Sequence, residues 1–344
     1  MIKIKNIKNK NRNLGLELLR MILSFFIVVI HCCNVKNKIL FKLLFEKPFH
    51  VSFFFLTSFY FSYNIFLSRN IFKIKLRFLR ILIPYIIWPM IIYIINNSFY
   101  IFFGLSLYNK KLLFKELVIQ IILGRNYHQV FWFQFNLIFI SLLFTILSFI
   151  IKEHFLLILQ IIGIIAYYLQ YSSLNYNIFF SYHDNIKHTV GLIVEMMPIA
   201  VTGLILKSID LLEKLRIIRK QSLLLIFIIF ILILHIDFII RPKGLLYPGI
   251  LINIGAILLF SFFGIMLINE KLNKNLIVII SYITKYTGGV YYLHTVVRNI
   301  IIEKISLVNN RTYSGALIIY IICFLVCFIG NTILRKTELK YLFY

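Results

Sequence analysis

Three ionisable side chains lie inside the first apolar stretch of the chain, residues 14–33. Glu17, Arg20 and His31 interrupt a run that is otherwise long enough to cross the hydrocarbon core of a bilayer. On an α-helix, the spacing of Arg20 and His31 leaves them about 20° from alignment on one face and about 16 Å apart along the axis. An ionised side chain at membrane depth is costly unless it faces protein or water. The shared face therefore predicts a polar lining, and Glu17, one turn before Arg20, is placed to pair with it.

A plainer interpretation is equally good for each residue taken alone. Arg20 would extend back to the nearer interface, and His31 would sit among lipid headgroups. The alignment of the two residues on one face is what favours a functional site.

A second basic pair precedes a later apolar stretch. Arg77 and Arg80 are three positions apart, so both guanidinium groups point the same way if the helix extends over them. Guanidinium forks suit phosphate oxygens better than an ammonium group does. The alternative is ordinary anchoring by positive charge on the cytoplasmic side of the membrane.

Three further side chains are candidates with weaker support. Trp132 opens an apolar stretch and is most simply a residue of the interfacial aromatic belt. Glu195 and His294 lie well inside apolar sequence, where ionisable groups mark sites or pair with neighbouring helices. Both interpretations of Glu195 fit the sequence equally well.

The composition defines the elements that must position these residues. Hydrophobic residues make up 61% of the chain and charged residues 14%, which is typical of an integral membrane protein. The formal net charge of +25 is spread over short loops and forms no basic domain, so we expect membrane lipid and not nucleic acid as the surrounding partner.

We predict an all-α polytopic bundle of about ten transmembrane helices. Residues 1–344 form a single domain with a basic tail at 1–13, and the excess of Lys and Arg in alternate loops favours cytoplasmic positions for both termini. Residues 117–123 are too short to span and indicate a re-entrant or interfacial piece. The expected spans are 14–33, 49–67, 81–103, 130–151, 155–171, 189–206, 222–240, 249–268, 285–303 and 314–334.

The ordered motifs resemble those of the membrane acyltransferase 3 family. Arg20, ten intervening residues and His31 are similar to the Arg-X10-His signature of its first helix, and Arg77-Phe-Leu-Arg80 is similar to its cytoplasmic Arg-X-X-Arg motif. Phe54 to Phe61 resembles the second-helix pattern, although Ser58-Phe59 stands where the family usually has Ser-Gly. Phe131-Trp132-Phe133 resembles its fourth-segment Trp motif. The segment from Tyr286 to His294 is similar to its late Thr-X-Gly-X-Tyr-Leu-X-His-type segment.

This resemblance implies a bacterial inner-membrane enzyme that O-acylates surface glycans. The expected donor is cytoplasmic acyl-CoA, with acetyl-CoA favoured, bound through Arg77 and Arg80. The expected acceptor is a hydroxyl of a polysaccharide or of a lipid-linked glycan precursor. We expect His31 to act as general base, Arg20 to stabilise oxyanion charge or fix the donor, and Glu17 to orient Arg20. A covalent acyl-histidine remains an alternative route. We expect no metal site and no permanently bound cofactor.

Other functional classes also fit part of the pattern. A transporter or exporter of glycan or lipid precursors uses intramembrane Arg, His and Glu residues along its path, although no clear internal repeat appears. A glycan polymerase is a third class, for which the longest outer segment, 104–129, is modest. Dependence on an acyl-CoA donor separates the enzyme from the transporter.

Overall fold

A computed structural model describes the chain at residues 13–32, 49–103, 108, 110–124, 130–171, 185–215, 220–240, 250–266, 274–304 and 312–343. Within these ranges the regular structure is entirely helical, with no strand. Seven of the described helices are long and apolar enough to cross a membrane. The predicted all-α membrane bundle is therefore confirmed, whereas the count of about ten spans and the cytoplasmic side of both termini stay predictions.

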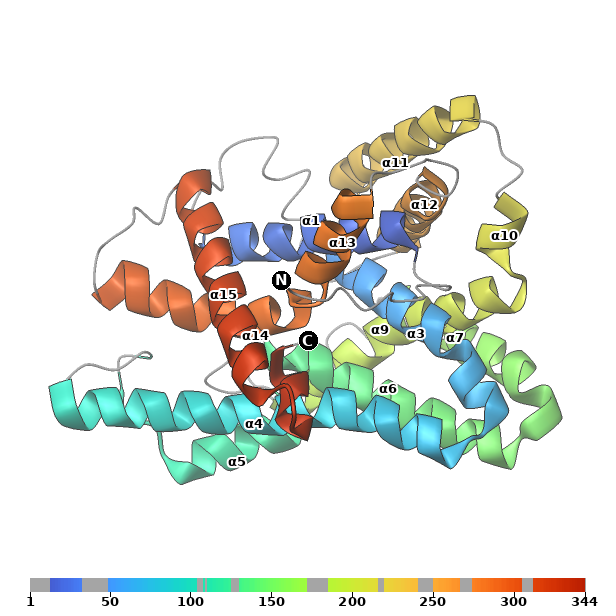
Figure 1. The fold of residues 1–344 in the computed structure, drawn as a ribbon. Helices are drawn as coiled ribbons and strands as arrows, with labels where there is room; N and C mark the ends of the chain where they lie inside the picture. The colour runs from blue at the N-terminus through green and yellow to red at the C-terminus, as the bar shows by residue number, and fades with distance from the viewer. Residues whose placement is uncertain are drawn as a thin grey trace.

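Nine of the ten expected spans each overlap one helix of the structure, and the span 285–303 is divided between an α-helix and the π-helix that follows it (Figure 1). The long helices are α1 (Leu14–Cys32), α3 (Phe49–Ser68), α4 (Ile71–Phe103), α6 (Phe131–Ile150), α7 (Phe155–Tyr171), α9 (Asn185–Ser208), α11 (Lys220–Ile240), α12 (Ile250–Met266) and α15 (Tyr313–Leu334). The shorter ones are α5 (Phe114–Leu123), α10 (Leu211–Leu215), α13 (Lys274–Thr284) and α14 (Thr287–Arg298), with η1 (Lys152–His154), the π-helical η2 (Asn299–Lys304) and η3 (Glu338–Phe343).

The start of α4 differs from the expected span 81–103. The helix begins at Ile71, because Asn70 accepts a hydrogen bond from the backbone nitrogen of Lys73 at 3.1 Å and caps its first turn. Basic residues lower the mean hydropathy of the first turns but do not oppose helix formation. A prediction from apolarity alone therefore begins this helix too late. Arg77 and Arg80 consequently lie on the helix, and Pro84 lies well inside it.

Helix α1 occupies the centre of the bundle and packs against α3, α12, α13, α14 and α15. Its start is fixed by Asn13, whose side-chain oxygen accepts from the Leu16 backbone nitrogen at 3.1 Å. The amide nitrogen of the same side chain donates to the Gly264 carbonyl of α12 at 2.6 Å. This cap holds the turn that carries Glu17 against a neighbouring helix.

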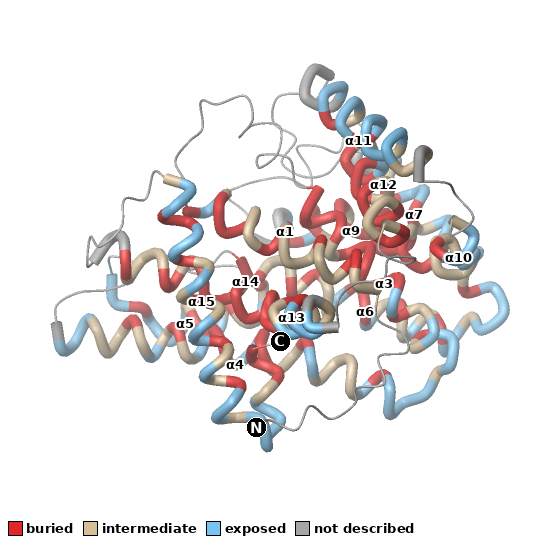
Figure 2. The backbone as a smooth tube through the Cα atoms, turned by 45° about the horizontal axis from the view of Figure 1, so that its top comes forward, coloured by how far each residue is buried: buried red, intermediate tan, exposed pale blue. Residues whose placement is uncertain are grey.

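The buried side chains form two hydrophobic cores that α1 joins. Its first half, with Leu19 and Leu23, packs into a core shared with α3, α6, α7, α9 and α12. Its second half, with Val28 and Val29, packs into a core shared with α4, α14, α15 and η3. Buried residues gather at the centre of the bundle around α1, α9 and α14, whereas most residues of α11 are exposed (Figure 2).

Large apolar side chains also cover much of the outer surface. On α11, Leu224, Leu225 and Leu232 are more than half exposed, and Ile164 on α7 is 68% exposed. A water-soluble protein of this size would bury such side chains, whereas a lipid bilayer solvates them. The outer surface therefore agrees with a multi-pass membrane protein.

Candidate active site

A cavity of about 570 Å³ lies where the two hydrophobic cores meet. Its walls come from α1, α3, α4, α6 and α14. The described residues that line it include four basic side chains and no Asp or Glu. The basic residues are Arg20, Lys73, Arg77 and Arg80. A cavity with this lining favours an anionic ligand, because guanidinium and ammonium groups attract phosphate and carboxylate oxygens.

A tight turn between α3 and α4 assembles one wall of the cavity. Arg69 adopts a positive φ of 49° directly after α3, and α4 begins two residues later. The Arg69 side chain donates through Nε to the Ser148 carbonyl of α6 at 2.8 Å. This turn places the last two turns of α3 against the first two turns of α4, so Ser62 faces Arg77.

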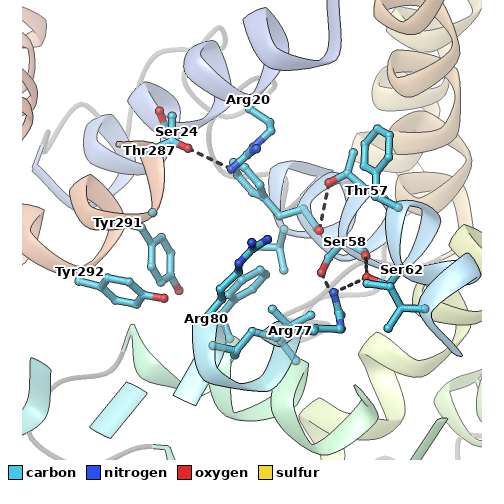
Figure 3. Close-up of a pocket in the computed structure, with 18 of the residues that line it drawn as sticks. Arg20, Ser24, Thr57, Ser58, Ser62, Arg77, Arg80, Thr287, Tyr291 and Tyr292 are labelled. Carbon is cyan, nitrogen blue, oxygen red and sulfur yellow. Dashed lines mark hydrogen bonds between the residues drawn. The ribbon is translucent and has the colours of Figure 1, made fainter. Parts of the chain in front are cut away.

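Arg77 is held by three serine hydroxyls from two helices. Its guanidinium donates to Ser62 and, at 3.3 Å, to Ser58 on α3 (Figure 3). It also donates to Ser141 on α6 at 3.0 Å. The rings of Phe59 and Phe66 each lie 5.5 Å from its central carbon. Among the described residues, its buried Nε has no hydrogen-bond partner. Hydroxyls and aromatic faces therefore fix this cation in place, with no carboxylate among its described partners.

Arg80 approaches the cavity from the next turn of α4 and is more exposed than Arg77. Its guanidinium carbon lies 5.7 Å from the centre of the Tyr341 ring, in η3. The two arginines therefore share a face, as their spacing predicts, but their surroundings differ. Arg77 is fixed by the protein, and Arg80 is available to a ligand.

Arg20 enters the cavity from α1. Its Nη2 donates to the Thr287 hydroxyl at 3.3 Å, at the first residue of α14 (Figure 3). Glu17, one turn earlier, accepts from the Thr284 hydroxyl at 3.4 Å, at the end of α13. Both residues of α1 therefore contact the junction of α13 and α14. A direct pairing of Glu17 with Arg20 stays a prediction.

His31 lies beyond the cavity, on the same face of α1 as the residues that line it. Arg20, Ser24 and Ile27 line the cavity at helical spacing, and His31 follows Ile27 by one turn on the same face. The side chain of His31 is exposed and is not part of the lining. The structure therefore supports the shared face of Arg20 and His31 but separates the histidine from the basic end of the cavity.

His294 is brought next to His31 by the packing of α14 on α1. The two imidazole rings have centroids 5.1 Å apart. His294 is fully buried, and its Nδ1 lies 3.3 Å from the Val290 carbonyl. The ring of Tyr291 lies 6.1 Å from that of His294 and also lines the cavity. Tyr291 thus stands between the cavity and the two histidines, and its hydroxyl donates to the Val130 carbonyl at 2.6 Å.

Trp132 and Glu195 do not line the cavity. Trp132 packs against the core around α3 and α9, beside Phe133, which is a lining residue. Glu195 is fully buried on α9, a helix that packs mainly on α3 and α7. The structure groups Arg20, Arg77 and Arg80 in one cavity and His31 with His294 beyond it. Within the described ranges, no group of three His, Cys, Asp or Glu side chains is placed to hold a metal.

Sequence reasoning missed the residues that hold these groups. Ser58 and Ser62 are one turn apart on α3, and paired small polar residues inside an apolar span are a usable signal for a polar helix contact. Ser141 gives no such signal, because a single serine in an apolar helix most often bonds its own backbone. Thr287 and Tyr291 lie inside the late motif, but nothing in the sequence distinguishes them from their neighbours.

Comparison with known proteins identifies the family. A family model described as an acyltransferase domain matches residues 13–335, nearly the whole chain and all of the cavity. Comparisons with curated proteins and with solved structures found no match. With its helical fold and apolar outer surface, the chain belongs to the membrane acyltransferase 3 family and is an acyltransferase of that general kind.

Proposed function

We propose that this protein transfers an acetyl group from cytoplasmic acetyl-CoA to a hydroxyl of a surface polysaccharide or of its lipid-linked precursor. The reaction takes place in the cytoplasmic membrane of a bacterium. The observation that carries the proposal is the cavity with four basic side chains and no acidic one, which follows α1 toward His31. The acceptor class and the bacterial membrane rest on the family resemblance.

The donor fits the basic end of the cavity by charge. Coenzyme A carries several phosphate groups, and guanidinium groups bind phosphate oxygens through paired hydrogen bonds. Arg80 and Lys73 are the cations that a ligand entering between α3 and α4 meets, because both are exposed. Arg77 supplies a fixed charge behind them. The aromatic wall of Phe54, Phe61 and Phe133 then offers an apolar surface to the pantetheine arm.

The chemistry belongs at the other end of α1. The acceptor oxygen attacks the thioester carbonyl, an ester C–O bond forms, and the C–S bond breaks to release the CoA thiolate. His31 takes the proton of the acceptor hydroxyl and returns it to the thiolate. Arg20, fixed by Thr287, lies about 16 Å along α1 from His31 and therefore holds the donor instead of reaching the carbonyl oxygen. Glu17 orients Arg20 through their shared contact with the α13–α14 junction.

Transfer of label from acetyl-CoA tests this proposal. Membranes carrying the wild type, His31→Ala or Arg80→Gln are incubated with labelled donor and glycan acceptor, and protein amounts are matched. We expect labelled glycan from the wild type, none from His31→Ala, and a raised donor KM for Arg80→Gln. Tyr168→Leu serves as control, because Tyr168 is 71% exposed on the outside of α7.

Three outcomes would change the proposal. Label in glycan from His31→Ala at the wild-type rate removes His31 from the chemistry. Label retained on the protein in the absence of acceptor indicates a covalent acyl-enzyme route instead of direct transfer. Glycan movement across the membrane without any donor requirement, and without label transfer, indicates the transporter instead.

A further inference from the structure

Residues 341–343, within η3, insert into the bundle beside the basic cavity. Tyr341, Leu342 and Phe343 are all buried. The indole nitrogen of Trp88 on α4 donates to the Leu342 carbonyl at 2.9 Å. The Phe343 ring meets the Trp88 ring edge-on at a centroid distance of 5.9 Å. Helix η3 accordingly packs against α4, α14 and α15, near the mark C in Figure 1. We call residues 341–343 the docked segment.

Two glycines form the slot that receives the docked segment. A Cβ atom added to Gly330 on α15 would lie 2.3 Å from the tip of the Phe343 ring. A Cβ atom added to Gly289 on α14 would lie 3.1 Å from the Phe343 Cα and carbonyl oxygen. The absence of side chains at both positions therefore permits this close approach. The docked segment connects α4, which carries Arg80, to α14 and α15.

Tyr341 links the docked segment to the cavity. The guanidinium carbon of Arg80, a lining residue, lies 5.7 Å from the Tyr341 ring centre, and Lys340 Nζ lies 5.0 Å from the same centre. A cation over an aromatic face is attracted by the negative potential of the ring. An exposed arginine side chain otherwise samples many rotamers, and a ligand that binds it must restrict them.

We propose that Tyr341 is a positioning residue that holds Arg80 toward the cavity for a phosphate of the donor. The inference rests on the proposed function, since it assigns Arg80 to donor binding. Tyr341 touches Arg80 and not the reacting atoms, so its loss weakens donor binding and leaves the chemical step unchanged. Phenylalanine retains the aromatic face, and leucine removes it.

The first experiment compares Tyr341→Leu with Tyr341→Phe and with Tyr168→Leu as the matched control. CoA binding is measured by calorimetry on the purified full chain, and donor KM and kcat are measured by label transfer. Tyr341→Leu raises the CoA Kd and the donor KM about 2- to 5-fold, which is the contribution of one exposed cation–π contact. Tyr341→Phe restores both values, and kcat is unchanged in all three variants.

A second perturbation acts from the opposite side of the slot. Gly330→Ala pushes the docked segment out by crowding the tip of the Phe343 ring, so it also raises the CoA Kd. Phe343→Leu removes the crowded ring atoms, so the double variant Gly330→Ala with Phe343→Leu regains part of the lost affinity. This arm tests the segment even where Tyr341→Leu fails to fold.

The results separate the inference from the proposed function. If Arg80→Gln weakens CoA binding while Tyr341→Leu, properly folded, binds CoA as the wild type does, the positioning role of Tyr341 is overturned. A kcat lowered equally by Tyr341→Leu and Tyr341→Phe also overturns it. If neither the wild type nor Arg80→Gln binds CoA, the proposed donor is wrong, and the assignment of Arg80 falls with it.

Discussion

Replacing Ser141 with alanine removes one of the hydroxyls that hold the Arg77 guanidinium. The bond from Arg77 Nη2 to Ser141 Oγ is 3.0 Å long, and Ser141 is fully buried. A hydrogen bond to a charged group contributes about 1.5–3 kcal/mol, and its loss leaves a partly buried N–H without an acceptor. We therefore expect Ser141→Ala to lower the free energy of unfolding by about 2 kcal/mol.

Ser148 provides a matched control on the same helix. It is 1% exposed, and its hydroxyl donates to the Thr145 carbonyl of its own helix at 2.8 Å. Ser148→Ala removes only this local bond and gains helix propensity, so we expect a change within about 0.5 kcal/mol. The Ser148 carbonyl that accepts from Arg69 is a backbone atom and is retained in the variant.

A double-mutant cycle with Arg77→Met isolates the contact. Denaturant unfolding of the purified proteins in mixed micelles gives the free energy of unfolding for the wild type, both single variants and the double variant. The coupling energy between Arg77 and Ser141 is expected to be about 1–2 kcal/mol, because the two residues share one hydrogen bond. Equal losses for Ser141→Ala and Ser148→Ala, or a coupling energy near zero, would refute the reasoning.

Three further changes have defined outcomes. Tyr291→Phe removes the hydrogen bond to the Val130 carbonyl, just before α6, and so loosens the ring between the cavity and the histidines. In the label-transfer assay, we expect kcat to fall by a larger factor than the donor KM rises. His294→Asn removes the ring that contacts His31, and we expect kcat to fall at least about 10-fold with CoA affinity unchanged. Gly203→Ala places a Cβ 2.5 Å from a backbone oxygen of α3, and we expect it to lower the free energy of unfolding by about 1–3 kcal/mol. Gly255→Ala is its control, because the added Cβ would lie 3.5 Å from the Phe230 ring. We expect this variant to be neutral or stabilising.

Simple outcomes would contradict these three predictions. A kcat unchanged by Tyr291→Phe removes the ring from the path between cavity and histidines. A His294→Asn variant with wild-type kcat leaves the contact between the two imidazoles as packing only. Equal unfolding energies for Gly203→Ala and Gly255→Ala contradict the close packing of α9 on α3.

The sequence predicts the helices well because apolarity is the dominant signal in a membrane chain. The expected span 14–33 agrees with α1 to within one residue, since the apolar run is long and Asn13 caps its start. The same signal fails at α4. There, basic residues lower the mean hydropathy of the first ten helical residues, so a prediction from apolarity omits them. Those turns carry two of the three arginines that line the cavity.

The spacing of charged residues predicts faces but not distances between elements. The alignment of Arg20 with His31 and of Arg77 with Arg80 follows from helical geometry alone. The meeting of Arg77 with Ser141, 64 positions apart in sequence, depends on how α4 packs against α6. The contact of Tyr341 with Arg80 depends in the same way on two glycines of other helices. Such contacts are tertiary, and no local pattern encodes them.

The position of the cavity between the two cores follows from the charges that the chain places there. Arg20 and Arg77 cannot enter either apolar core without hydroxyl partners, so the helices that carry them leave a polar space where the cores would otherwise merge. On α1, Ile27 is the last residue that lines this space, and it lies about one helical turn before His31. Under the proposed function, a donor whose phosphates contact Arg80 and whose arm reaches Ile27 places its thioester about 6 Å along the axis from His31. An imidazole side chain and an acceptor hydroxyl together span a gap of that length, so the proposed transfer requires no large movement of α1.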